Sequence, residues 1–352
     1  MTALDTKDLD AIQHVIDQHS EVLFTWDYER SRPALVKLYE KAKTSQWNAS
    51  TQLDWSTDVD LGQLASESAA ANSRFNVLRD DPESPVRSWG DKEWSQFAVE
   101  MQTFLLSQFL HGEQGALICT GLITATAPWY DAKLYAATQV MDEARHVEVF
   151  GRYIDEKLGG AYPINANLRS LLDTIVEDNR WDITYLGMQI MVEGLALAAF
   201  GFMHALTAEP LLKDLLRYVM SDEARHVAFG VLSLQEFYAS LDSKEIRERQ
   251  EFAYQAAVQL KQRFMSPDVW LRMGADPVEV VKFIRSRNDP GQTVFQTMLF
   301  SKIVPNCRKL GILDAGDGWL RRKFEELDII QFENLVDTTE EYGTLDAVAA
   351  DA

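Results

Sequence analysis

The sequence predicts an all-α protein built around a four-helix bundle, and three observations support this fold class. The hexapeptide Asp-Glu-Ala-Arg-His-Val occupies residues 142–147 and returns at residues 222–227, an offset of 80 residues. Glu113 and Glu193 each stand 30 residues before the glutamate of the next hexapeptide. Long apolar patterns of helical period surround these positions, and no run alternates apolar and polar residues over a convincing strand length. The repeat therefore indicates two related helical hairpins in one core.

Composition limits the classes of partner. The chain has 352 residues, of which 46% are hydrophobic, so a large buried core is feasible. Its formal net charge of −20 argues against nucleic acid and against anionic membrane surfaces as partners. Part of this acidic excess belongs to the metal site described below.

The two cysteines and the apolar segments indicate a cytoplasmic protein. Cys119 and Cys307 lie far apart and form no CxxC pattern, so we expect neither a disulfide framework nor a thiolate metal site. Residues 1–10 are acidic and polar, unlike a secretory signal. The longest apolar stretch, 194–206, has 13 residues and is too short to span a bilayer.

The first third of the chain predicts a helical extension over 1–90. A first helix is expected over 6–24 and a second over 33–46, which begins at Pro33, a residue favoured in the first turn. The stretch 47–61 is irregular, and we expect its tryptophans to pack over the bundle. The acidic, proline-containing segment 80–85 is predicted to form a turn or linker.

The remaining helices follow from hydrophobic periodicity and from breaks at proline and glycine. The predicted ranges are 91–123, 129–158, a shorter joining helix at 165–178, 180–206, 210–239 and 243–265. Short connections make the ligand-bearing helices two antiparallel hairpins. We therefore expect a single helical domain over 1–352, with a dinuclear-metal core at 91–239 and a C-terminal helical extension at 243–337. Breaks are expected at Pro267, Pro277, Pro290 and Pro305.

Six side chains form a predicted dinuclear metal site. Residues three apart on a helix lie on one face, so each Glu-x-x-His directs two ligands the same way. Two inward-facing helices with one Glu and two with Glu-x-x-His build a dinuclear carboxylate site in a bundle. The predicted metal ligands, which are also the predicted catalytic groups, are Glu113, Glu143, His146, Glu193, Glu223 and His226. The alternative is that these residues are surface charges on amphipathic helices.

The ligand types favour iron or manganese, because carboxylates and imidazoles without thiolate suit these metals. A metal-bound histidine usually donates its other ring N–H to a carboxylate. Asp142 and Asp222 are the candidates for this role, with crossed pairing of Asp142 to His226 and of Asp222 to His146. The neighbouring arginines of the hexapeptides, Arg145 and Arg225, pair either with these aspartates or with other carboxylates at the surface.

Positions one turn from the ligands are candidates for a substrate pocket. They are Ala116, Leu117, Thr120, Phe150, Gln189, Ala196 and Leu197. The small residues at 194–199 indicate either close helix packing or room for an apolar substrate.

These motifs resemble those of the ferritin-like superfamily of non-haem dinuclear iron proteins. More narrowly, they resemble its oxygen-activating branch: multicomponent monooxygenase hydroxylases, ribonucleotide reductase small subunits, acyl-carrier desaturases and arylamine N-oxygenases. The resemblance lies within 91–239 and implies a ferritin-like four-helix bundle with additional N- and C-terminal helices. It does not define a subfamily. Phe150 stands where the reductases carry a radical tyrosine, Val219 where the N-oxygenases carry an extra histidine, and Leu197 where the hydroxylases often carry threonine.

The resemblance implies a non-haem diiron oxidoreductase that resembles a monooxygenase. The expected cofactor is a pair of iron ions, with manganese and iron as the alternative pair. The expected reaction is hydroxylation, desaturation or N-oxygenation of a small, apolar organic substrate with O2. The expected partners are a ferredoxin or reductase that donates electrons and a second copy of the chain in a homodimer. The alternatives are a ferroxidase or iron-handling protein without an organic substrate, and an interaction protein with a residual metal site.

Overall fold

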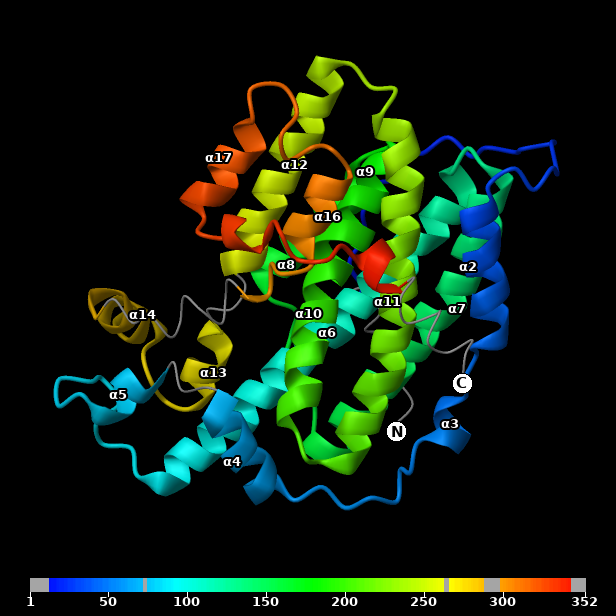
Figure 1. The fold of residues 1–352 in the computed structure, drawn as a ribbon. Helices are drawn as coiled ribbons and strands as arrows, with labels where there is room; N and C mark the ends of the chain where they lie inside the picture. The colour runs from blue at the N-terminus through cyan, green and yellow to red at the C-terminus, as the bar shows by residue number, and fades with distance from the viewer. Residues whose placement is uncertain (1–12, 72–74, 263–265, 288–297, 343–352) are drawn as a thin grey trace.

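The computed structural model describes residues 13–71, 75–262, 266–287 and 298–342 (Figure 1). Within these ranges every regular element is a helix, which confirms the all-α fold class. The centre is a four-helix bundle, and shorter helices cover two of its sides (Figure 1).

Four long helical segments form the bundle, and their bounds are close to those predicted. They are α6 (Asp91–Thr126), α7 (Tyr130–Tyr153), a third segment over 181–206, and α11 (Pro210–Tyr238). Helix α6 packs against α7, and the end of the third segment packs against α11. Each pair is joined by a few residues, so the core consists of the two expected hairpins.

Local sequence sets where these helices begin and end. Pro210 occupies the first position of α11, and the Glu209 carboxylate accepts hydrogen bonds from the backbone N–H groups of Leu211 (2.9 Å) and Leu212 (2.6 Å). Helix α7 continues into a π-helical turn, η3 (Ile154–Leu158), and stops at Gly159. Gly159 has a φ of 83°, a left-handed conformation that glycine adopts without steric cost.

The third core segment is less regular than the single helix predicted for it. It consists of α9 (Trp181–Tyr185), the π-helix η4 (Leu186–Val192) and α10 (Glu193–Leu206). Glycines allow close packing at the π-helix: a Cβ at Gly187 would lie 2.5 Å from Ile175, and a Cβ at Gly230 would lie 2.6 Å from the Gln189 Cβ. The wider turn changes the angular phase of the residues before Glu193.

The run Trp181–Leu206 is long and apolar enough to cross a membrane by length and composition. However, 83% of its most apolar window is buried inside the protein. Its apolar character is therefore that of a central bundle helix, covered by α8 (Ala166–Glu177) and α12 (Ser243–Gln262) as well as by the bundle itself.

The helix predicted over 6–24 is wrong for its described part. Residues 13–32 contain no regular element, and residues 6–12 lie outside the described ranges. The backbone N–H of Leu23 donates to the Ala125 carbonyl (2.9 Å), and the Thr25 hydroxyl donates to the Pro128 carbonyl (3.0 Å). This segment thus makes hydrogen bonds with the end of α6 and with the α6–α7 connection, and not those of a helix. Val15, one of the apolar positions that indicated a helix, is 80% exposed.

The other N-terminal helices cover the bundle. Helix α2 (Pro33–Thr44) matches the second predicted helix and packs on α7 and α11. The predicted irregular stretch contains one short helix, and Trp47 there is buried against Tyr218 with ring centroids 4.8 Å apart. The remaining N-terminal elements are α3 (Ala49–Gln52), α4 (Leu61–Ala71) and α5 (Asn76–Asp80).

After α12, the described part of the C-terminal extension consists of short helices. They are α13 (Pro267–Arg272), α14 (Pro277–Ser286), α16 (Ile303–Lys309), α17 (Trp319–Glu326) and the 3-10 turn η5 (Ile330–Phe332). The prolines at 267 and 277 begin helices, and Pro305 lies in the first turn of α16. The expected break at Pro290 lies outside the described residues.

We predict that Gly230→Ala lowers the free energy of unfolding by about 1–3 kcal/mol, because the new Cβ would overlap the Gln189 Cβ. Urea denaturation would measure this change. Gly121→Ala is the matched control, since that glycine is exposed within α6, five residues before its last residue, with no atom close to an added Cβ. The control should stabilise the protein by about 0.5–1 kcal/mol. Equal effects at both positions would contradict the packing argument.

Candidate metal centre

The six predicted ligand side chains lie together in the middle of the bundle, and all are buried. Helices α6 and α10 each supply one glutamate, and α7 and α11 each supply a glutamate and a histidine. Their donor atoms form two sets, and the atoms within each set lie within 4.8 Å of one another. One set is Glu113, Glu143, His146 and Glu223, and the other is Glu143, Glu193 and His226. The sets share Glu143.

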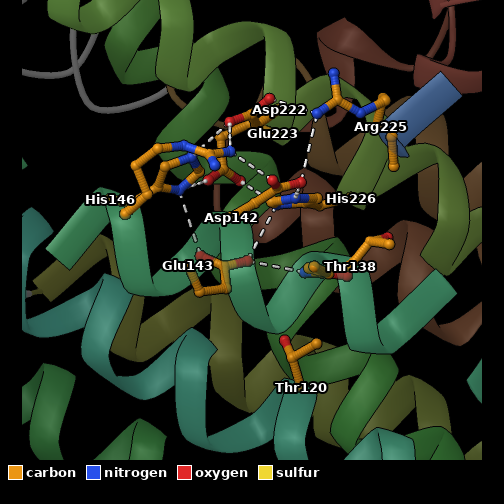
Figure 2. Close-up of polar contacts among 12 residues, drawn as sticks. Thr120, Thr138, Asp142, Glu143, His146, Asp222, Glu223, Arg225 and His226 are labelled. Atoms are coloured by element: carbon orange, nitrogen blue, oxygen red, sulfur yellow. Dashed lines mark hydrogen bonds and ion pairs between the residues drawn. The ribbon is translucent and has the colours of Figure 1, made fainter. Parts of the chain in front are cut away.

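Two glutamates lie between the two imidazole rings. His146 Nδ1 is 3.4 Å from Glu143 Oε2 and 3.1 Å from Glu223 Oε1. His226 Nδ1 is 3.0 Å from Glu143 Oε1 and 3.7 Å from Glu223 Oε2. Each of these two carboxylates therefore directs one oxygen to each ring, which is the geometry of a bridging ligand (Figure 2). Glu113 Oε2 lies only on the His146 side, 3.3 Å from Nδ1.

The far nitrogen of each ring contacts an aspartate of the opposite hexapeptide. His146 Nε2 lies 3.2 Å from Asp222 Oδ2, and His226 Nε2 lies 3.3 Å from Asp142 Oδ2 (Figure 2). This is the crossed pairing that the sequence predicts. It orients both rings so that their Nδ1 atoms face the glutamates.

Two buried arginines neutralise the aspartates. Arg145 donates to Asp142 (2.5 Å) and to Asp222 (3.1 Å), and Arg225 donates to both aspartates as well. Of the two alternatives for the arginines, the structure has the pairing with the aspartates, and neither guanidinium is at the surface. The result is a four-residue ion-pair network behind the imidazoles.

Helix α2 and the residues after it complete this network, which the sequence reasoning missed. The Trp47 indole N–H donates to Asp222 Oδ2 (2.8 Å), and the Gln46 amide donates to Asp142 Oδ1 (3.0 Å). Gln46 lies 96 residues before Asp142, the first residue of the first hexapeptide, and Trp47 follows it in a stretch without a repeat. No spacing in the sequence identifies them.

The sequence reasoning also missed Gln139, although a repeated pattern in the sequence could have identified it. Its amide donates to Glu143 Oε1 (2.9 Å) and Glu193 Oε1 (3.0 Å), so it connects ligands from both hairpins. The pattern Tyr-x3-Gln-x-Met-x-Glu ends at Glu143 and again at Glu193, which makes Gln189 the counterpart of Gln139. Gln189 lies in the π-helix, and its amide atoms are buried without a hydrogen-bond partner.

Burial and neighbouring charges shift the pKa values of the cluster. Burial, with the charge of Glu223, raises the pKa of Glu113 to about 8. Burial alone would also raise the pKa of Glu143, but the two imidazoles hold it well below its usual value. Burial would lower the pKa of His146, yet its hydrogen bonds, first with Asp222, raise that pKa well above its usual value. Protons thus balance the charge of this cluster, and a metal ion would displace them.

The donor set fits two divalent cations. Apart from the imidazole–carboxylate contacts, several ligand atoms are buried without a hydrogen-bond partner: Glu143 Oε2, Glu193 Oε2, both Glu223 oxygens and His226 Nδ1. Buried carboxylate oxygens that face one another are costly unless a cation lies between them. Four glutamates carry four negative charges, which two divalent ions would neutralise. Neither set of ligand atoms includes a cysteine, and both cysteines are buried free thiols.

A small cavity of about 10 Å³ adjoins the cluster, with Glu113, Glu193 and Glu223 in its wall. Two of the predicted pocket residues, Ala116 and Ala196, also line it. Gln108, Phe109, Gly112 and Val192 complete the wall, and the sequence reasoning did not include them. A space of this size holds about one water-sized molecule.

The other predicted pocket residues lie elsewhere. Leu197 lines a separate pocket of about 570 Å³ between α10, α11 and residues 301–342. The Thr120 hydroxyl donates to the Ala116 carbonyl (2.7 Å), and Thr120 stands apart from the contacts of the cluster (Figure 2). Phe150 packs on Phe200 with ring centroids 5.5 Å apart. Leu117, Thr120, Phe150 and Gln189 are absent from the walls of both spaces.

The fold and the donor geometry together define a class: a helical-bundle protein with a buried carboxylate–histidine site suited to two metal ions. No protein-family model matches the chain, and no curated protein matches it. Among solved structures, similar chains are R2-like ligand-binding oxidases.

Three of these structures illustrate the similarity. A Val-to-Leu variant of the oxidase with an anaerobically reconstituted Mn/Fe cofactor has a TM-score of 0.48 and 17% identity, with 81% of this chain and 95% of that chain covered. A Tyr-to-Phe variant, also anaerobically reconstituted, has a TM-score of 0.46 and 18% identity, with 75% of this chain and 94% of that chain covered. The oxidase aerobically reconstituted with Mn/Fe has a TM-score of 0.42 and 18% identity, with 89% of this chain and 96% of that chain covered. At these values the comparison assigns no activity to this chain, and the class rests on the geometry above.

We predict that Glu143→Ala removes both metal ions, because its carboxylate belongs to both donor sets. Glu113→Ala should remove only the ion on the His146 side. Metal analysis after loading with ferrous ion under anaerobic conditions would count the ions per chain. Glu148→Ala is the control, since Glu148 lies on the same helix but is exposed. Retention of two ions by Glu143→Ala would contradict the assignment of the ligands.

We also predict that Trp47→Phe weakens metal retention by roughly tenfold or more, because Asp222 loses a hydrogen bond while it orients His146. Competition with a chelator would measure the loss. Trp55→Phe serves as the control: that indole N–H donates to the Ala49 carbonyl (2.7 Å), away from the cluster. A similar loss in both variants would mean that Trp47 acts only through packing.

Proposed function

We propose that this protein is an O2-activating dinuclear iron oxidase or oxygenase that acts on a small apolar organic substrate. The observation that carries the proposal is the pair of donor sets that share Glu143, enclosed in a bundle and next to a small cavity. Purely structural carboxylates would not be expected to face one another without hydrogen-bond partners.

The six residues of the two donor sets would hold the metal ions, and Glu143 belongs to both sets. Two ferrous ions, or one manganese and one iron ion, would supply electrons to O2 and so provide an oxidant for the substrate. Asp142 and Asp222 hold the imidazoles in the tautomer that directs Nδ1 to the metals. The Gln139 amide positions Glu143 and Glu193. The apolar core excludes water, which strengthens all of these interactions.

The reaction needs an external source of electrons. Insertion of one oxygen atom of O2 into a substrate consumes two further electrons and two protons and releases water. The sequence contains no flavin, nicotinamide or iron–sulfur motif that would supply them. We therefore propose a ferredoxin or reductase as the donor, a homodimer as the assembly and the cytoplasm as the location.

A ferroxidase without an organic substrate is the second candidate, and the size of the cavity favours it. A space of about 10 Å³ beside the carboxylates admits O2 or water but no organic molecule in this conformation. This candidate predicts that the protein oxidises successive additions of iron and does not respond to organic ligands.

The test is to load the protein anaerobically with two ferrous ions per chain and to mix it rapidly with O2. We expect a visible absorption band that persists for seconds while both irons stay bound, and whose decay accelerates with a suitable organic substrate. Prompt oxidation with continued iron uptake would favour the ferroxidase. Failure to bind stoichiometric iron would overturn both candidates.

A further inference from the structure

The cavity at the candidate metal centre has a volume of about 10 Å³. Gln108, on α6, is 2% exposed and lines it together with Glu113 and Glu193. Gly112 and Ala116 follow Gln108 at intervals of four residues on the same face of α6 and also line the cavity, and Ala196 of α10 adds a second small side chain. An organic substrate therefore needs this cavity to enlarge or to open.

Both ends of the Gln108 amide are bound by one segment of backbone. Its Nε2 donates to the Pro163 carbonyl (3.0 Å), and its Oε1 accepts from the Asn165 N–H (2.7 Å). The segment 162–165 connects η3 to α8 and crosses α6 at this point. Gln108 thus joins the wall of the cavity to a connection near the surface.

The ends of this segment are anchored, and its middle is not. Tyr162 is 2% exposed: its N–H donates to the Ser107 hydroxyl (2.9 Å), and its carbonyl lies 2.9 Å from His111 Nε2. Asn165 caps α8 by accepting from the Asn167 N–H (2.9 Å). Between these anchors, Pro163 is exposed and Ile164 is half-buried. The span Pro163–Ile164 is therefore held by the Gln108 amide and by the packing of Ile164 on the hydrophobic core.

A surface groove lies on the other side of the same span. Its volume is about 770 Å³, which is within the range of small-molecule sites. Pro163, Ile164 and Asn165 line it, together with residues of α13 and α14 and with Gln262 at the end of α12. Most of the remaining wall is apolar: Ala166, Pro267, Pro277, Val278 and Val281. The groove and the metal-side cavity are thus separated by Gln108 and the span that it holds.

We propose that Gln108 and the span Pro163–Ile164 form a gate through which an apolar substrate passes from this groove to the metal centre. This inference rests on the proposed function, because only an oxidase with an organic substrate needs such a passage. Release of the Gln108 amide breaks its two hydrogen bonds with Pro163 and Asn165. The hydrogen bonds of Tyr162 and Asn165 keep the two ends of the segment 162–165 in place while the span moves.

Access to the cavity can be measured on the metal-free protein with a thiol reporter. Ala196→Cys places a thiol in the cavity wall, and benzyl methanethiosulfonate serves as an apolar probe. The modification rate of each cysteine is followed by peptide mass spectrometry. In the Ala196→Cys protein, we expect Gln108→Ala to accelerate labelling by about tenfold, which corresponds to a loss of about 1.4 kcal/mol.

Two further variants keep this test independent of global destabilisation. Gln108→Glu retains the acceptor for Asn165 but loses the donor to Pro163. In the Ala196→Cys protein, its labelling rate should therefore fall between the rate with Gln108 and the rate with Gln108→Ala. Gln114→Ala changes an exposed glutamine of the same helix and should leave the rate unchanged. Cys307 reports on general unfolding, because it is buried in the C-terminal extension. An unchanged rate in Gln108→Ala, or equal acceleration at Cys307, would overturn the gate.

The route itself is tested by blocking each of the two larger pockets. Val281→Trp fills the groove and should slow labelling in the Gln108→Ala background. Ala198→Trp fills the pocket between α10 and α11 instead and should have no effect. The reverse result would place the entrance at α10–α11 and refute the proposal. Because these rates need no metal, they distinguish a failed gate from a failed assignment of the metal centre.

Discussion

The structure depends on charges that are held inside an apolar bundle. Four glutamates and two histidines lie where solvent cannot screen them, and two aspartates and two arginines form an ion-pair network behind the histidines. Such an arrangement is stable only if every charge has an opposite charge or a donor close by. The arginines satisfy this condition for the aspartates, and Trp47 adds a neutral donor. The four glutamates share two imidazoles and the Gln139 amide, and several of their oxygens have no hydrogen bond, which is the strongest physical reason to expect cations among them.

The segments before Glu143 and Glu193 share a sequence pattern but not a local structure. Gln139 and Gln189 occupy equivalent places in the pattern Tyr-x3-Gln-x-Met-x-Glu, yet only Gln139 donates to the carboxylates. Gln139 lies in the α-helix α7, whereas Gln189 lies in the π-helix η4, whose wider turn changes the direction of its side chains. Glycines at 187 and 230 give that wider turn the space it needs. Glu143 and Glu193 thus have different surroundings.

The centre is enclosed, and this enclosure matters for its chemistry. Exclusion of water strengthens the electrostatic contacts among the buried charged groups. The same enclosure leaves a cavity too small for an organic molecule. The bundle therefore needs a movable part if it oxidises such a molecule. The contacts of Gln108 place that part where α6 meets the connection between the two hairpins.

The sequence by itself determined the helical class, the bounds of the core helices and the convergence of six ligands. It could do so because helical periodicity and i,i+3 spacing are local properties, and the hexapeptide repeat relates the two halves. The crossed pairing of Asp142 and Asp222 with the histidines followed from the same repeat. Only the tertiary structure decided where Trp47 and Gln46 lie, that residues 13–32 form no helix, and which small residues line the cavity. These features depend on contacts between segments far apart in the chain, which no local pattern records. The π-helix before Glu193 also depends on contacts between distant segments. Close packing at Gly187 and Gly230 accommodates it, and Gly230 lies on another helix, α11.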